Sequence, residues 1–245
     1  MAKSLFPAPL ASSASSVLGP FLALAVVLAV GVPAFFGWQI QRAGSLGFWL
    51  LVIVPTVVVA AGAVIRAHRD GELRDWVKPR WGDATAGVLG GLVLSGAAYL
   101  FTRTVAPLHS PREAWLARLY LQIGDPTELR QQTTLVAAVL IVASVAEELV
   151  WRGLVTTLLA ERWGSRAAWL VSALLYALAH LPAAWALADA HAGPNWLLPA
   201  GALGAGLVWG AMVRLKGGSL APAMIAHALF DWVIVMTFRL WGAGL

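Results

Sequence analysis

Six ionisable side chains in the C-terminal half of the sequence lie inside stretches that are otherwise apolar. They are Glu147, Glu148, Arg152, His180, His227 and Asp231. A charged side chain at the centre of a membrane-spanning helix costs roughly 2.5–3.5 kcal/mol on insertion scales, so it marks a candidate functional site. Carboxylates and imidazoles also serve as general bases, oxyanion-stabilising groups and metal ligands. These six residues are therefore the first candidates for chemistry.

The spacing of these residues along a helix separates them into pairs. Glu148 and Arg152 are four residues apart, so they share a helix face and can neutralise each other. Glu147 lies about 100° further round the same helix and lacks that partner. His227 and Asp231 are also four residues apart. The spacing thus predicts a buried ion pair beside an unpaired carboxylate and a second His–carboxyl pair.

Three motifs in this region resemble those of the CPBP family of intramembrane endopeptidases, which includes CAAX prenyl proteases and bacteriocin-processing enzymes. Residues 147–152 read E-E-x-x-x-R, residues 176–180 read aromatic-x-x-x-H, and residues 227–231 read H-x-x-x-D. The resemblance covers about 130–235 and depends on all three motifs occurring in order, each on its own apolar stretch. Two positions depart from the commonest pattern: Tyr176 stands where most members have Phe, and Asp231 where many have Asn.

The resemblance implies a glutamic protease in which Glu147, aided by His180, activates a water molecule. His227 and Asp231 would then face the scissile carbonyl and its oxyanion. An ionised Asp231 could also hold the His227 ring in one tautomer. The side chain of Tyr176 is expected to form a wall of the site and to have no chemistry of its own.

The supporting residues and the cofactor are less sharply defined. Glu148 and Arg152 are expected to act as a structural pair. No cofactor is favoured, but zinc stays open, because His180, His227 and a carboxylate from Glu147 or Asp231 would make a three-ligand site with an open position. The sequence has no H-E-x-x-H, G-x-G-D or G-x-S-x-G motif, which argues against other intramembrane protease classes.

The composition predicts a membrane protein. Of the 245 residues, 60% are hydrophobic and only 12% are charged, whereas soluble domains have about 25% charged residues. A spanning helix needs roughly 20 apolar residues. Windows of this kind lie at 17–38, 44–66, 84–106, 132–160, 165–187, 196–214 and 219–240. We expect an all-α, polytopic membrane protein with about seven transmembrane helices, or eight if a further short span exists.

Two parts of the chain are expected. Residues 1–130 would hold the N-terminal transmembrane helices and an interfacial segment, and residues 131–245 the catalytic helical core. The first window follows Lys3 but is longer than the apolar region of a signal peptide, so we expect it to be retained. The stretch 108–131 could lie in the headgroup plane or fold back on the helices. The fourth window is longer than one membrane thickness, so it must tilt, break or project beyond the bilayer.

The distribution of charge suggests the surroundings and partners. Basic residues cluster in short connections such as 66–80, where acidic residues alternate with them. This pattern is typical of membrane flanks and argues against a nucleic-acid partner. More Lys and Arg lie on the side of the N-terminus, which favours a cytoplasmic N-terminus. The expected location is a bacterial inner membrane, with lipids as partners.

The expected substrate is a membrane-anchored or C-terminally tagged protein or peptide, cut near its C-terminus or membrane segment. A transporter or proton relay is the alternative from another class, because buried Glu, His and Asp also mark ion pathways. It would predict polar residues in both halves of the bundle. The first three windows contain almost no ionisable residue away from their ends, which favours the protease.

Overall fold

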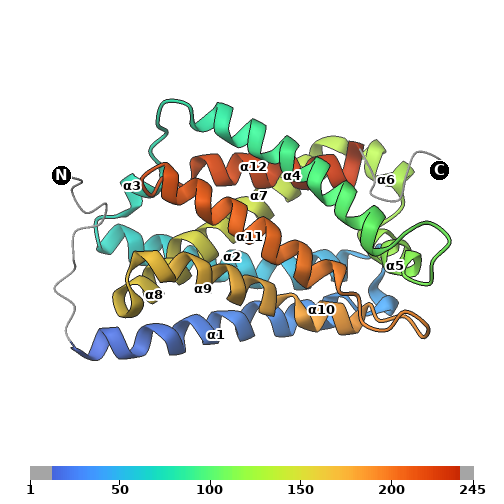
Figure 1. Cartoon of the computed structure of the whole chain (residues 1–245), viewed down its shortest axis with the longest axis horizontal. Helices are drawn as coiled ribbons and strands as arrows, with labels where there is room; N and C mark the ends of the chain where they lie inside the picture. Colours follow the sequence, from blue (N-terminus) through green and yellow to red (C-terminus); the bar gives the residue numbers. More distant parts are fainter. Residues whose placement is uncertain (1–12, 238–245) are drawn as a thin grey trace.

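The computed structural model describes residues 13–237, which form a bundle of helices (Figure 1). The α-helices in chain order are α1 (Ser13–Gly37), α2 (Leu46–Arg69), α3 (Leu73–Val77), α4 (Asp83–Val105), α5 (Glu113–Ile123), α6 (Pro126–Gln131), α7 (Thr133–Glu148), α8 (Thr156–Trp163), α9 (Ser165–Ala179), α10 (Leu181–Ala186), α11 (Leu197–Leu215) and α12 (Ala221–Trp232). The other helical elements are the 3₁₀ helix η1 (Ile40–Arg42) and the π-helices η2 (Leu149–Val155) and η3 (Val233–Thr237). The predicted all-α fold is confirmed.

The helices have the lengths and surfaces of membrane spans. Within residues 13–237, six segments are long and apolar enough to cross a membrane: Val17–Gly37, Leu46–Arg69, Asp83–Val105, Thr133–Trp163, Ser165–Ala186 and Leu197–Leu215. The seventh predicted window corresponds to a shorter apolar helix, Ala221–Met236. Residues 238–240 of that window, and Lys3 before the first, lie outside the described residues. The chain is a polytopic helical membrane protein.

The N-terminal helices pack directly on the C-terminal ones. In Figure 1, α1 runs along one edge of the bundle beside α8 and α10, and α4 runs along α12 on the opposite side. Glycines allow the second contact: a Cβ atom at Gly87 would lie 2.6 Å from the Cβ of Ile225, and one at Gly91 would lie 2.9 Å from the carbonyl oxygen of Ala226. The division at residue 130 stays a prediction, since both parts share this bundle.

The fourth span runs as one continuous helix of 31 residues, Thr133–Trp163, with a π-helical stretch inside it. The π-helix η2 separates α7 from α8 and begins directly after Glu148. The carbonyl oxygen of Trp151 accepts hydrogen bonds from the hydroxyls of Thr156, at 2.8 Å, and of Ser172 in α9, at 2.7 Å. π-Helical turns occur frequently at functional sites. This π-helical stretch therefore coincides with the E-E-x-x-x-R motif of the sequence.

The stretch 108–131 folds back on the helices. Trp115 and Tyr120 of α5 are 3% and 2% exposed. The Tyr120 hydroxyl donates to the carbonyl of Ile234 at 3.1 Å, and the Gln122 amide donates to the carbonyl of Gly37 at 2.8 Å. Of the two interpretations left open by the sequence, these contacts support the connector that packs against the bundle.

Candidate active site

The glutamate pair lies at the end of α7, where the two carboxylates face different neighbours. The Glu148 side chain is completely buried, whereas Glu147 is half-buried. Adjacent residues on a helix point about 100° apart, so one carboxylate is directed towards α12 and the other towards α9. The site therefore consists of two adjoining groups of polar side chains.

Glu148 is the centre of the first group. Its Oε1 atom lies 3.0 Å from Nη1 of Arg152 and 2.8 Å from Nδ1 of His227. The side chains of Glu148, Arg152 and His227 are 0%, 4% and 4% exposed. The ion pair predicted from the spacing is confirmed, and His227 joins it from α12. Since a carboxylate only accepts hydrogen bonds, Nδ1 of His227 carries a proton in this arrangement.

Arg152 links this group to α9 and α11. Its guanidinium lies over the ring of Tyr176 at 4.7 Å and over the ring of Trp209 at 5.0 Å. Desolvated cation–π contacts are worth about 2 kcal/mol or more. A Cβ atom at Gly206 would lie 3.3 Å from Nη2 of Arg152, so the glycine allows α11 to approach this closely. The buried charge is thereby enclosed by a carboxylate and two aromatic faces.

His227 is held at one ring face and at both ring nitrogens. Its ring stacks on Trp209 with centroids 3.8 Å apart and an interplanar angle of 18°. Its Nε2 atom lies 3.5 Å from Oδ2 of Asp231, and the same oxygen accepts a hydrogen bond from the Ser144 hydroxyl at 2.9 Å. Because Nδ1 is committed to Glu148, only Nε2 can donate to a substrate, and only if it carries a second proton. The shorter orienting contact of His227 is thus to Glu148, not to Asp231 as the sequence suggested.

The second group consists of Glu147, Tyr176 and His180. The Tyr176 hydroxyl donates to Oε2 of Glu147 at 2.7 Å. The rings of Tyr176 and His180 meet edge to face, with centroids 4.6 Å apart. Nδ1 of His180 lies 2.8 Å from the backbone carbonyl oxygen of Tyr176. A carbonyl can only accept, so Nδ1 carries the proton and Nε2 of a neutral His180 has a free lone pair.

The end of α9 explains why that carbonyl is available. In an unbroken α-helix the carbonyl of Tyr176 would accept from the backbone N–H of His180. That N–H instead bonds to the carbonyl of Ala177 at 3.1 Å. Pro182 follows in the first turn of α10, where it is tolerated because its missing N–H has no partner in a helix start. The end of the α-helix at this point therefore leaves the Tyr176 carbonyl free to orient the ring of His180.

The C-terminal part of the chain is similar in sequence to a known protein family. Residues 129–233 match the family described as "Type II CAAX prenyl endopeptidase Rce1-like". Residues 129–233 are an Rce1-like domain. All three sequence motifs lie within it, and the expected membership of the CPBP family is confirmed. No curated protein and no solved structure matches the chain.

The structure adds two residues to the Rce1-like site that sequence reasoning missed. The sequence predicts that Tyr176 forms a wall of the site, yet its hydroxyl donates to Glu147. Ser144 belongs to none of the three motifs, yet its hydroxyl donates to Asp231. A signal existed for both. Ser144 lies four residues before Glu148 and is the single polar residue between 135 and 146, and Tyr176 departs from the motif's usual Phe.

The zinc site left open by the sequence would use His180, His227 and a carboxylate from Glu147 or Asp231. Across residues 13–237, no group of three or more His, Cys, Asp or Glu side chains is gathered in a way that could hold a metal ion. The Nδ1 atoms of His180 and His227 are both engaged by protein acceptors, so only their Nε2 atoms could face an ion.

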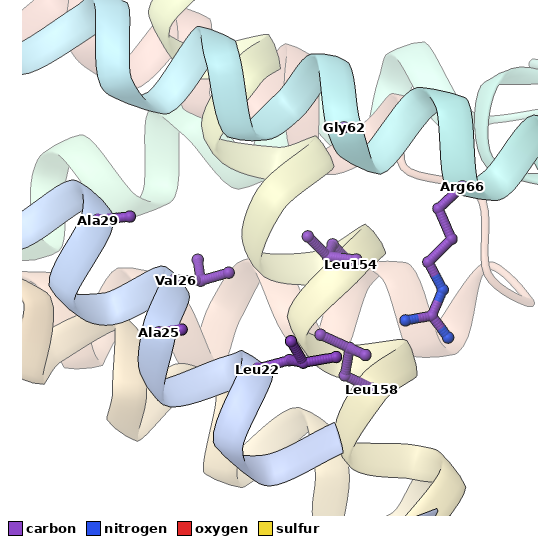
Figure 2. A pocket seen from close by; sticks show the side chains of 8 residues that line it. All are labelled: Leu22, Ala25, Val26, Ala29, Gly62, Arg66, Leu154 and Leu158. Carbon is purple, nitrogen blue, oxygen red and sulfur yellow. The ribbon is translucent and has the colours of Figure 1, made fainter. Parts of the chain in front are cut away.

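An apolar cavity of about 340 Å³ lies outside the polar site, between α1, α2 and the η2–α8 segment (Figure 2). Leu22 and Val26 of α1 face Leu154 and Leu158, and Arg66 of α2 lies at one end. The Arg66 guanidinium is paired with Glu161 and Asp70. No residue of the two polar groups lines this cavity, so it is not the active-site cleft.

Proposed function

We propose that this protein is an intramembrane endopeptidase that hydrolyses a peptide bond with a water molecule activated by Glu147 and His180. The observation that carries the proposal is the unequal pairing of the two glutamates. Glu148 is neutralised by Arg152 in a fully buried pair, whereas no ion pair to Glu147 is found within the described residues. A half-buried carboxylate without a cation is suited to take a proton. Its place in an Rce1-like domain supports this role.

The reaction consumes one water and no other reagent. One proton of the water faces Glu147 and the other faces Nε2 of His180. Glu147 takes its proton as the oxygen attacks the scissile carbonyl carbon. His227, protonated at Nε2, donates to the oxyanion that forms. Glu147 then passes the proton to the leaving nitrogen as the C–N bond breaks, which yields one new carboxyl and one new amine.

We infer that the substrate is a membrane-anchored or C-terminally tagged protein or peptide, cut near its C-terminus or membrane segment. The family description as CAAX prenyl endopeptidases supports this class. So does the position of Glu147 and Glu148 within a candidate span, where a substrate must arrive through or beside the lipid. The distribution of Lys and Arg supports a cytoplasmic N-terminus. The low charge and the Trp- and Ala-rich composition support a bacterial inner membrane.

Replacing Glu147 with Gln tests the function. The amide keeps the size and can still accept the Tyr176 hydrogen bond, but it cannot take a proton from water. We expect cleavage to fall at least about 10²-fold. Glu128→Gln is the matched control, because Glu128 is exposed in α6, away from the site.

Two assays detect the loss. The first compares N-terminal and C-terminal protein fragments in membranes that contain the wild-type protein, Glu147→Gln or Glu128→Gln. The second follows an internally quenched peptide that ends in a farnesylated CAAX sequence. The expected result is a set of fragments that wild type and Glu128→Gln produce and Glu147→Gln does not. Identical fragment sets in all three membranes, or near-normal turnover by purified Glu147→Gln, would overturn the proposal.

A further inference from the structure

Tyr176 contacts both residues that the proposed reaction assigns to the water molecule. Its hydroxyl donates to Glu147 at 2.7 Å, and its backbone carbonyl accepts from Nδ1 of His180 at 2.8 Å. We propose that Tyr176 is the positioning residue of the water-activating pair. It holds the Glu147 carboxylate and the His180 imidazole in fixed positions relative to each other. This inference rests on the proposed function and adds a residue to which the motif assigns only an aromatic ring.

The hydroxyl can fix Glu147 because its own ring cannot move. Tyr176 is 4% exposed. Its ring is met edge to face by Trp151 at 5.3 Å and by His180 at 4.6 Å, and the Arg152 guanidinium lies over it at 4.7 Å. Functional side chains are held best by neighbours whose own rotamers are locked by packing. The phenol oxygen is therefore a fixed donor.

The hydrogen bond divides the two oxygens of the carboxylate between two tasks. Oε2 of Glu147 accepts from Tyr176, which leaves Oε1 to accept from water. Without the hydroxyl, the carboxylate can rotate about its terminal torsion, which has a broad energy profile. A misplacement of about 1 Å can cost on the order of 10²-fold in rate. The hydroxyl thus acts on the rate of the chemical step, not on substrate binding.

The variant Tyr176→Phe isolates this contact. It retains the ring that packs on Trp151, His180 and Arg152, and it retains the backbone carbonyl that orients His180. Only the hydroxyl bonded to Glu147 is removed. Tyr120→Phe is the matched control: Tyr120 is 2% exposed, and its hydroxyl donates to a backbone carbonyl, that of Ile234.

The measurement separates kcat from KM for the farnesylated CAAX peptide. We expect Tyr176→Phe to lower kcat by about 10- to 100-fold. This is the change in rate that corresponds to the free energy of one hydrogen bond to a charged group. KM should stay at the wild-type value. The melting temperature in detergent should fall in both Tyr176→Phe and Tyr120→Phe, because each loses one hydrogen bond of a buried tyrosine. Only Tyr176→Phe should lose kcat at a temperature where both variants are folded. An unchanged kcat in Tyr176→Phe, or an equal loss of kcat in Tyr120→Phe, overturns the inference.

A spectroscopic measurement tests the contact between Tyr176 and Glu147 without depending on peptidase activity. The infrared carboxyl band that disappears in Glu147→Gln belongs to Glu147, and it should shift in Tyr176→Phe and not in Tyr120→Phe. A band that does not shift overturns the inference. If the wild-type protein itself leaves the peptide intact and produces no fragments in membranes, the proposed function fails, while the band still decides whether Tyr176 holds Glu147.

Discussion

Removing either partner of the Glu148–Arg152 pair should destabilise the protein more than removing both. The substitutions are Arg152→Met, Glu148→Leu and their combination, which fill much of the same volume without charge. Both side chains are at most 4% exposed, and Nη1 and Oε1 are 3.0 Å apart. Loss of one partner therefore leaves a buried charge uncompensated, which costs about 3–5 kcal/mol.

The size of the coupling follows from the contacts of the pair. Two independent losses would add to roughly 6–10 kcal/mol. In the double variant no buried charge is left by the pair, but the Nδ1 donor of His227 loses its acceptor, which costs about 1–3 kcal/mol. The double variant should therefore be at least about 3 kcal/mol more stable than additivity requires.

Reversible unfolding in mixed detergent micelles measures the four free energies of this cycle. The Arg66–Asp70 pair is the control. Its spacing is also i,i+4, but its side chains are 32% and 49% exposed. Exposed pairs are worth about 0–1 kcal/mol, so its cycle should show little coupling. Losses at Glu148 and Arg152 that add within about 0.5 kcal/mol would refute the buried-pair interpretation.

Two further predictions concern Asp231 and the π-helix. Asp231→Asn should keep activity within about tenfold of wild type, because an amide oxygen still accepts from Ser144 and from Nε2 of a protonated His227. The same samples test the metal: about one zinc per chain, with activity lost on chelation and restored on re-addition, would overturn the metal-free preference. Gly153→Ala should destabilise by about 1–3 kcal/mol, because its Cβ would lie 2.7 Å from the Trp76 ring. Gly96→Ala, with no such atom within 4 Å, should instead stabilise α4 by up to about 1 kcal/mol, and unfolding in micelles compares the two.

The helices and the ion pair could be predicted because both depend on local sequence. Apolar runs of spanning length give the helices directly, and an i,i+4 spacing places Glu148 and Arg152 on one face wherever the helix lies. The boundaries of the spans are harder to predict than their existence. The last window, 219–240, runs past residue 237, where the described part of the chain ends, so its full length stays a prediction.

The contacts of the site could not be predicted because they depend on how helices cross. Nothing in the spacing indicates that His227 reaches Glu148, 79 residues away, instead of depending on Asp231 in its own helix. The π-helix after Glu148 could not be predicted either, since apolar residues such as Leu149 and Val150 are compatible with an α-helix and with a π-helix. Packing against α9 and α11 decides both features.

The two histidines show how one fold prepares opposite roles from the same side chain. Each uses Nδ1–H on a protein acceptor and directs Nε2 elsewhere, but the acceptors differ: a neutral carbonyl of Tyr176 for His180, and the carboxylate of Glu148 for His227. The proposed reaction needs His180 neutral, so that Nε2 accepts from water, and His227 doubly protonated, so that Nε2 donates to the oxyanion. A second carboxyl, that of Asp231, faces the ring that must carry the charge. The acceptor on Nδ1 therefore distinguishes the ring proposed to help the base from the ring proposed to stabilise the oxyanion.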